Sequence, residues 1–378
     1  MKTSRAVVFD GRDRPFRCET VAIPALRVGE VLVRNEYTTL CRSDLNTFCG
    51  KRTERTPTIL GHEVVGRVEE LGPGAPAADC RGAALRIGDR ITWAIYAADP
   101  ASSLARRGLP QKAPDLFKYG HEPVTASSHL HGGLAEHCLL RRHTPIARLD
   151  EAVPLPVAAL INCAVATVAG SLRLAGDVRD GVVLVAGAGM LGVIACALSR
   201  CARAKRVVAV DIDADRLATA RSFGADVTVQ IGADRPDLAE RLAVELPGEP
   251  PSVALDYSGV PETMEALRAA LGIGGVLVLV GATFPQRPLS LDAEQIVRRL
   301  HTIKGLHNYN QADFVAAVGF IEAEHQKFPF ARLVHDRFTL DQADEAFAFG
   351  MKSRAHRVGI RTICQPAIAS PSSGASSP

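Results

Sequence analysis

Long apolar stretches and a secretion signal are both missing from this chain of 378 residues. Hydrophobic residues make up 47% of it, but Gly, Pro and charged residues interrupt them. We expect no run that approaches the roughly 20 apolar residues that a membrane span needs. The first residues, MKTSRAVVFDGRDRP, contain no apolar core of about 7 to 15 residues. We therefore expect a soluble, cytoplasmic protein that does not bind membranes.

An excess of one charge is also missing. The chain has 44 Lys and Arg against 41 Asp and Glu, spread along the sequence, which gives no reason to expect nucleic-acid binding. Nine cysteines without a secretion signal are expected to be thiols, metal ligands or core residues, not a disulfide framework. Because single hydrophobic cores stop growing below this chain length, we expect two domains.

The pattern of apolar residues changes near residue 180. Before Ile146, short apolar runs separated by turn residues (30–37, 62–72 and 88–93) predict a compact, mostly antiparallel β domain. After Gly181, apolar strands alternate with helical patterns of about a dozen residues, which predicts βαβ units on a parallel sheet. A helix over 313–325 and the mixed segment behind it are expected to rejoin the first domain. Residues 365–378, rich in Ser and Pro, are expected to be disordered.

A glycine-rich turn suggests a dinucleotide site. Gly187, Gly189 and Gly192 form the GxGxxG pattern of GAGMLG, between an apolar strand and a helical stretch, and Met190 and Leu191 lie inside it. Such a turn lets a pyrophosphate approach the backbone and presents free N–H groups at a helix start. Taken alone, the pattern also occurs in glycine-rich turns of unrelated α/β proteins.

An acidic residue at the end of the next strand strengthens this interpretation. Asp211 ends the strand VVAVD, about 20 residues beyond the last glycine, where a carboxylate binds the adenosine ribose and opposes a 2′-phosphate. The sequence therefore favours NAD(H) over NADP(H). Asp213 is the neighbouring acid, and we interpret it as the N-cap of the following helix.

Two cysteines and a histidine are candidates for a metal site. Cys41 and His62 lie in the β-rich part, and Cys163 lies much further along. A zinc ion that acts on an alcohol needs three protein ligands, for which thiolate and imidazole are suitable, and one open position. Spacing alone leaves buried structural side chains as the alternative for each of the three.

These candidates lie within segments that resemble a known family. The chain contains, in order, LCRSD, GHEVVGRVEELG, GDRI, GGLAEHC and GAGMLG. It thereby resembles the zinc alcohol dehydrogenase branch of the medium-chain dehydrogenase/reductase family, from about residue 5 to residue 362. Two further segments, GLPQKAPDLFKYGHE and GLHNYN, are similar to the subgroup named for its association with phosphonate catabolism.

The resemblance implies an α/β fold of two domains with the active site between them. A GroES-like, β-rich catalytic domain is expected over residues 1–160 and a Rossmann NAD(H)-binding domain, a doubly wound parallel sheet, over 161–307. Residues 308–364 are expected to return to the catalytic domain. The resemblance also implies a small-molecule substrate and a homodimer or homotetramer.

Site residues carry over position by position. Cys41, His62 and Cys163 match the family's catalytic zinc ligands, Glu63 matches the acid beside the metal, and Asp44 matches the acid that orients the histidine.

Further positions match groups that act on the substrate and the cofactor. Ser43 matches the hydroxyl that takes the alcohol proton, and Arg42 matches a pyrophosphate contact. Thr167 falls where the family places a residue at the nicotinamide face. The remaining matches lie in loops that line the cofactor: Ser258, Gly259, Val280 and Gly281.

Two departures from the family pattern bear on function. The family commonly carries four cysteines in a lobe after the GD-R segment, but residues 94–115 contain none. We therefore expect one catalytic zinc per subunit and no structural zinc. Asn46 stands where many members have a proton-relaying histidine, so proton release from Ser43 must go through water or the ribose.

Two groups of side chains remain open to more than one interpretation. His121, His129, His131 and His137 surround the GGLAEHC segment, and their irregular spacing favours core or surface histidines over a second metal site. Four cations on the loop before them are candidates for recognising an anionic group, with a solvated face as the alternative; these are Arg106, Arg107, Lys112 and Lys118.

The expected reaction is a reversible hydride transfer between an alcohol and NAD(H), in which zinc lowers the pKa of the alcohol and Ser43 accepts its proton. The substrate is expected to be a small anionic hydroxyalkyl compound or aldehyde, or a larger secondary-metabolite carbonyl. Reduction of an activated C=C bond, or reductive ring closure, is the alternative reaction. A non-catalytic NAD(H)-binding protein is the alternative of another class.

Overall fold

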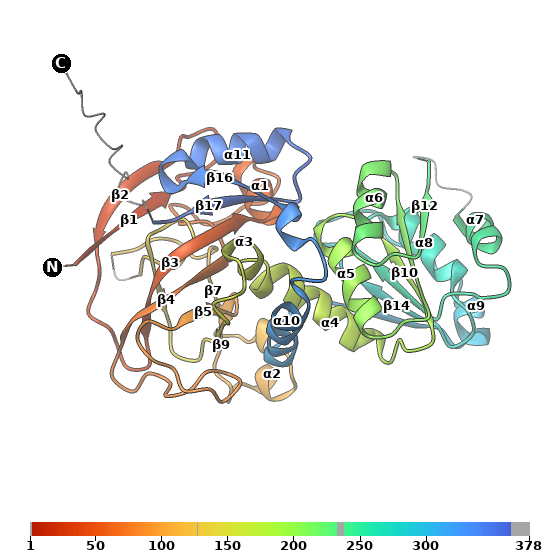
Figure 1. The fold of residues 1–378 in the computed structure, drawn as a ribbon, viewed down its shortest axis with the longest axis horizontal. Helices are drawn as coiled ribbons and strands as arrows, with labels where there is room; N and C mark the ends of the chain where they lie inside the picture. Colours follow the sequence, from red (N-terminus) through yellow and green to blue (C-terminus); the bar gives the residue numbers. More distant parts are fainter. Residues whose placement is uncertain (1, 127, 233–237, 364–378) are drawn as a thin grey trace, which may run out of the picture.

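The computed structural model describes residues 2–126, 128–232 and 238–363. Figure 1 shows a β-rich domain beside an α/β domain, with the chain passing from the first to the second and returning at its end. The α/β fold with a β-rich domain and a parallel-sheet domain is confirmed. The tail expected to be disordered, 365–378, lies outside the described residues.

The β-rich domain is built on a sheet in the order β16-β17-β3-β4-β5-β9, with β8 also paired to β3. Two small sheets, β1-β2 and β6-β7, flank it. The strands are β1 (Thr3–Val8), β2 (Arg17–Ala22), β3 (Val31–Leu40), β4 (Glu63–Leu71), β5 (Arg90–Trp93), β6 (Tyr96–Ala97), β7 (Phe117–Lys118), β8 (His137–Leu140), β9 (Ile146–Arg148), β16 (Val334–Thr339) and β17 (Arg357–Arg361). Its helices and 3₁₀ turns are α1 (Arg42–Phe48), α2 (Ser103–Arg106), η1 (Pro110–Lys112), α3 (Leu155–Ala158), η3 (Phe330–Leu333), η4 (Leu340–Gln342) and α11 (Ala343–Lys352).

The returning segment completes this sheet. Strand β17 pairs antiparallel with β3, with Val358 opposite Leu40, so the last strand lies directly beside the end of β3 that leads to Cys41. Strand β16 joins β17 in parallel. One wall of the candidate site is therefore formed by segments about 300 residues apart in the sequence.

The second domain contains a six-stranded parallel sheet in the order β12-β11-β10-β13-β14-β15. Its central strand β10 is the buried run VVLVA, as expected for a strand covered by helices on both faces. The strands are β10 (Val182–Ala186), β11 (Arg206–Asp211), β12 (Val227–Gln230), β13 (Val253–Asp256), β14 (Val276–Leu279) and β15 (Thr302–Gly305). The helices are α5 (Met190–Cys201), α6 (Ala214–Ser222), α7 (Leu238–Glu245), α8 (Pro261–Ala270) and α9 (Ala293–Arg298).

One helical run leads from the first domain into the second. It extends over Leu155–Ala175 with a mean hydropathy of 1.8 and includes the π-turn η2 (Ile161–Val165) and α4 (Ala166–Ala175). At 21 residues it is long and apolar enough to cross a membrane, so our expectation that no run approaches this length was wrong. Because 78% of its most apolar window is buried inside the protein, it packs as a core helix. The expected domain boundary at 160/161 falls within this run and stays a prediction.

Capping residues decide where two helices begin. Helix α10 (Gln311–Glu324) starts two residues before the expected 313, because the Asn310 side chain accepts from Asp313 N–H and the Asp313 side chain accepts from Asn310 N–H. Asp213 is confirmed as the N-cap of α6, where its side chain accepts from two backbone N–H groups.

Candidate metal and cofactor cleft

Four potential metal ligands converge where β3, β4 and η2 meet. The ligand atoms of Cys41, His62, Glu63 and Cys163 all lie within 4.8 Å of one another. Cys41 follows β3 and caps α1, His62 and Glu63 stand at the start of β4, and Cys163 lies in the π-turn. A π-turn is uncommon and frequently marks a functional position.

Asp44 organises the loop around His62. One of its carboxylate oxygens accepts from Cys41 N–H at 2.8 Å, and the other accepts from Gly61 N–H at 3.2 Å and lies 3.4 Å from His62 Nδ1. Ser43 Oγ lies 3.4 Å from Nε2, on the other side of the same ring. The imidazole of His62 therefore has the Asp44 carboxylate beside Nδ1, while Nε2 lies on the side of Ser43.

Asn162 ties the π-turn to the sheet. Its amide nitrogen donates to the carbonyl oxygens of His62 and Trp93, both at 2.9 Å. Its side-chain oxygen accepts from Val64 N–H. These three bonds fix the neighbouring Cys163 relative to the loop that carries His62.

Glu63 is paired with a residue that the sequence reasoning missed. Arg357, at the start of β17, places Nε 2.7 Å and Nη2 2.8 Å from the two Glu63 carboxylate oxygens. Its Nη2 also lies 3.6 Å from Cys41 Sγ, and Thr39 Oγ1 donates to Glu63 at 2.5 Å. Both charged side chains are buried. No local motif points to Arg357, because the pair joins residues 294 positions apart.

The residues around the two cysteines favour a thiolate at Cys41 and a thiol at Cys163. A hydrogen bond from Cys163, together with the nearby Arg357 and His62, lowers the pKa of Cys41 well below its usual value. The same hydrogen bond and burial raise the pKa of Cys163. Burial lowers the pKa of His62, but Asp44 and Cys41 outweigh it and raise this pKa to about 10. Two thiols and an imidazole at this separation are a donor set that suits tetrahedral zinc with an open position.

Two of the three glycines in the turn leave no room for a side chain. Gly187 has φ +88°, a left-handed conformation, and a Cβ there would lie 2.8 Å from Ser258 N. A Cβ on Gly192 would lie 1.9 Å from the Gly187 carbonyl oxygen. Asp211, buried at the end of β11, accepts from the N–H groups of Ala188 at 2.6 Å and Asp213 at 2.9 Å. The acid and the turn thus contact each other directly.

A cleft of about 870 Å³ between the two domains brings most of these residues together. The expected site residues that line it are Cys41, Arg42, Ser43, His62, Cys163, Thr167, Leu191, Ser258, Gly259, Val280 and Gly281. Ser258 and Gly259 follow β13, and Val280 and Gly281 follow β14, so they lie at the carboxyl ends of parallel strands, where such sheets bind ligands.

The other expected residues lie behind or beside this cleft. They are Asp44, Glu63, Gly187, Gly189, Met190, Gly192 and Asp211, which are not among its lining residues. Asn46, found in place of the relay histidine, does line it.

The cations that line the cleft are not the four that the sequence singled out on the loop before His121. Of the four cations singled out there, only Lys118 lines the cleft, whereas Arg106 and Arg107 are exposed. Lys112 contacts His307 Nδ1 at 2.6 Å. The four loop cations therefore do not line the cleft together, whereas two cations not considered from the sequence, Lys51 and Arg52, do line it.

The four histidines separate in space. His121 is buried, lines the cleft and packs its ring against His62 with centroids 5.0 Å apart. His131 is buried elsewhere, with its ring against Phe117. Among the described residues, only the Cys41 group qualifies as a metal cluster.

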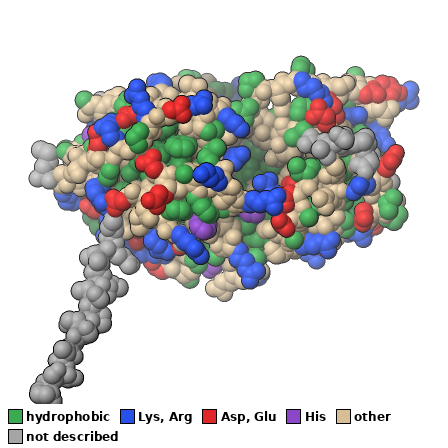
Figure 2. Space-filling view, turned by 90° about the horizontal axis from the view of Figure 1, so that it is seen from above, with side chains coloured by type: hydrophobic (Ala, Val, Ile, Leu, Met, Phe, Trp, Pro, Cys, Tyr) green, Lys and Arg blue, Asp and Glu red, His purple; other side chains and the backbone are tan. Residues whose placement is uncertain are grey.

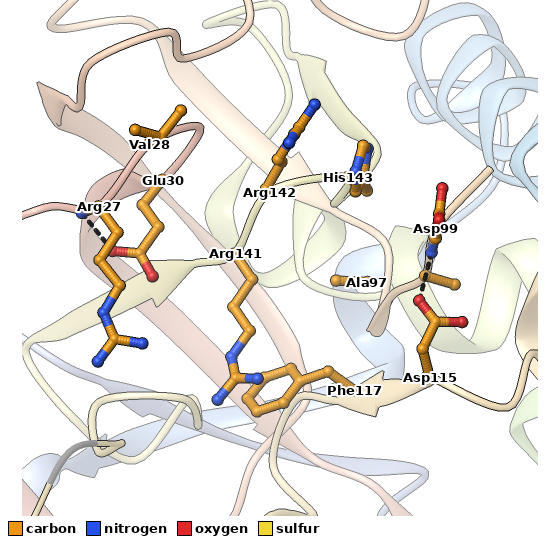
Figure 3. A pocket seen from close by; sticks show the side chains of 11 residues that line it. Arg27, Val28, Glu30, Ala97, Asp99, Asp115, Phe117, Arg141, Arg142 and His143 are labelled. Carbon is orange, nitrogen blue, oxygen red and sulfur yellow. Dashed lines mark hydrogen bonds between the residues drawn. The ribbon is translucent and has the colours of Figure 1, made fainter. Parts of the chain in front are cut away.

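A second hollow, of about 280 Å³, lies on the β-rich domain (Figure 3). Two of its carboxylates accept backbone N–H groups: the backbone N–H of Arg27 donates to Glu30 at 2.8 Å, and that of Asp99 donates to Asp115 at 2.7 Å. The Arg141 guanidinium lies 3.7 Å from the Phe117 ring centroid. In the described part of the chain the group of potential metal ligands lies at Cys41, so this hollow offers no comparable chemistry.

Family comparisons agree with this geometry. Residues 27–151 match the alcohol dehydrogenase GroES-like domain, and residues 191–323 match the zinc-binding dehydrogenase family. Together the two matches cover more than half of the chain.

Individual relatives are similar over almost their whole length. Sorbitol dehydrogenase of Rattus norvegicus is 28% identical over 365 residues, covering 93% of each chain. The 5-exo-hydroxycamphor dehydrogenase of Pseudomonas putida is 29% identical, covering 92% of this chain and 95% of the relative. The solved alcohol dehydrogenase of Thermotoga maritima has a TM-score of 0.88 at 24% identity, over 96% of this chain and 100% of the other, and shares the fold.

Proposed function

The chain belongs to the zinc-dependent alcohol dehydrogenase branch of the medium-chain dehydrogenase/reductase family, and we propose that it interconverts an alcohol and an aldehyde or ketone with NAD(H). One observation carries this proposal. The potential ligands Cys41, His62 and Cys163 open onto the same cleft as Ser258 and Val280, which follow two strands of the cofactor domain. Metal and nicotinamide would therefore face each other across one substrate.

The residues of this chain would divide the work as follows. Cys41, His62 and Cys163 would hold a zinc ion, which supplies Lewis acidity to the substrate oxygen. NAD(H) would accept or donate the hydride. Ser43, whose Oγ lies 3.4 Å from His62 Nε2, is placed to take or return the substrate proton at its hydroxyl.

Proton release from Ser43 differs from that of relatives with a histidine relay. Asn46 lines the cleft but carries no titratable group. We infer that water in the cleft or the cofactor ribose accepts the proton next. We therefore expect the residue at position 46 to affect the rate of proton transfer and not the binding of ligands.

We infer a preference for NAD(H) over NADP(H). The Asp211 carboxylate contacts the glycine turn through Ala188 N–H at 2.6 Å, and an acid at this position of a dinucleotide site would oppose a 2′-phosphate. A solved zinc-binding dehydrogenase of Sinorhizobium meliloti with a TM-score of 0.81 was obtained bound to NADP. The fold alone therefore does not decide between NAD(H) and NADP(H), and the preference for NAD(H) rests on Asp211.

Four further features stay predictions. They are one zinc per subunit, a homodimer or homotetramer, a cytoplasmic location and membership of the subgroup associated with phosphonate catabolism. The first follows from the cysteine-free stretch 94–115, and elemental analysis giving two zinc ions per subunit would contradict it.

A turnover screen with product identification tests the proposed reaction. Zinc-loaded protein is assayed with NADH and NADPH against aldehydes, ketones and activated alkenes of matched size, and the products are identified by mass and NMR. We expect alcohols from the carbonyl compounds and faster use of NADH. A saturated carbonyl product from the alkenes would instead support C=C reduction, and turnover of none of them would support a non-catalytic role.

A further inference from the structure

The cleft between the domains carries charge of one sign. Its lining includes Arg42, Lys51, Arg52 and Lys118, and among the described residues no Asp or Glu lines it. Figure 2 shows Lys and Arg side chains around the recess between the two domains. A hollow with one sign of charge concentrates ligands of the opposite sign.

Lys118 is held at the cleft wall by the pairing of two short strands. It lies on β7, where it pairs with Tyr96 of β6, and the next residue, Tyr119, donates its N–H to Ile95 O at 2.9 Å. Ile95 itself lines the cleft. In the described parts of the chain, the Lys118 ammonium forms no ion pair. Burial, with Arg52 close by, lowers the pKa of Lys118 to about 8. A partly desolvated ammonium is unfavourable unless an anion accompanies it.

Arg52 stands beside it, fixed by a shared carboxylate. Glu54 Oε1 lies 2.7 Å from Arg52 Nη2 and 2.9 Å from His121 Nδ1. The His121 ring in turn packs against His62, with centroids 5.0 Å apart. This chain of contacts places the cationic pair next to the potential metal ligands, on the catalytic domain. Glu54 is the nearby carboxylate and is already bound to Arg52 and His121, so Lys118 and Arg52 together share one negative charge.

We propose that the cleft takes a substrate bearing an anionic group, which Lys118 and Arg52 bind while the reacting carbon faces the metal ligands. The group is a carboxylate, phosphonate, phosphate or sulfonate, all of which offer oxygen acceptors to ammonium and guanidinium. This inference rests on the proposed oxidoreductase function. The competing explanation is that the two cations serve the cofactor phosphates, a task for which Arg42 and the start of α5 are already placed.

Binding of redox-inert probes tests the anion subsite without turnover. Zinc-loaded protein saturated with NAD⁺ is titrated calorimetrically with propylphosphonate, propanesulfonate and butanoate, and with neutral butanamide. We compare the parent with Lys118→Met, Lys118→Arg and Arg106→Met; Arg106 is a matched control, since it is exposed and outside the cleft. Metal content and thermal unfolding verify that each variant is folded.

The parent is expected to bind at least one anion more tightly than butanamide. Lys118→Met should weaken that binding about ten- to a hundredfold, as for the loss of one charge-assisted contact, and Lys118→Arg should retain most of it. The anion that binds best identifies the head group. No preference of the parent for any anion, or an equal loss in Arg106→Met, overturns the proposal.

Turnover then separates the substrate from the cofactor. The ratio of kcat/KM for 4-oxobutanoate and 2-oxoethylphosphonate to that for butanal is measured in the parent and in Lys118→Met. We expect this ratio to fall by a similar factor, through KM. A raised KM for NADH with an unchanged ratio would assign Lys118 to the cofactor and overturn the proposal. If the parent reduces no aldehyde, the oxidoreductase function fails, while the binding titration still decides the subsite.

Discussion

Removal of the Arg357 guanidinium is expected to destabilise the catalytic domain severely. Arg357 pairs with both oxygens of Glu63, and the two side chains are only 6% and 0% exposed. Burial raises the pKa of Glu63, and Arg357 opposes that rise. Loss of one partner of a buried pair leaves an uncompensated charge and costs about 3 to 5 kcal/mol. Arg357→Met should therefore lower the free energy of unfolding by that amount.

The chain provides a specific probe and a matched control for this measurement. Its single tryptophan, Trp93, is buried in the β-rich domain, so tryptophan fluorescence during urea unfolding reports on this domain alone. Arg361 lies on the same strand and pairs with Asp336 at 2.6 Å, but is about half exposed. Arg361→Met should cost only about 0 to 1 kcal/mol, as usual for surface pairs.

A second substitution separates the lost charge pair from lost packing. Glu63→Gln removes the buried charge, so the Arg357→Met/Glu63→Gln variant should recover part of the stability lost in Arg357→Met. Thr39, which donates to Glu63 at 2.5 Å, can donate to the amide oxygen as well. If Arg357→Met costs no more than Arg361→Met, or the double variant is less stable than Arg357→Met, the reasoning about the buried pair is wrong.

Three further predictions concern the cleft. Cys41→Ala or Cys163→Ala should lose zinc while the parallel-sheet domain stays folded, because the core of that domain does not depend on the ion; elemental analysis showing full zinc content would refute that ligand. Asp211→Gly should narrow or reverse the preference for NADH over NADPH, and equal use of both cofactors by the parent would contradict the role of Asp211. Burial, with Arg52 and Lys112 nearby, lowers the pKa of Lys118 to about 8, although Cys163 and Glu54 oppose the shift, so its ammonium is present below that pH and lost above it. The preference for permanently charged over neutral aldehydes should therefore decline between about pH 7 and pH 9, and a preference that does not change with pH would exclude Lys118 as its source.

The sequence was informative wherever function depends on neighbours in the chain. The roles of Ser43 and Asp44 follow from the family resemblance of the segment LCRSD, whereas the glycine turn and Asp211 follow from the pattern of strands and helices around them. The same alternation of strands and helices predicted the parallel sheet.

Contacts between distant segments could not be read in this way. Arg357 meets Glu63 only because β17 pairs with β3, and nothing near residue 357 signals this. From the sequence, the four cations on one loop could either recognise an anion or form a solvated face. In the structure only Lys118, on the strand β7 that pairs with β6, lines the cleft. The length of the apolar run Leu155–Ala175 was underestimated because a few polar residues, such as Asn162, interrupt it in the sequence. In the structure Asn162 is buried and forms hydrogen bonds within the protein.

The zinc dependence of NADH formation tests the central claim most directly. Zinc-loaded protein is incubated with NAD⁺ and a panel of primary and secondary alcohols, including anionic ones, and the absorbance of NADH is followed before chelation, after it, and after zinc is restored. The account predicts NADH from at least one alcohol, loss of that activity with the metal, and its return with zinc. NADH formation at the same rate in the zinc-free protein would contradict it.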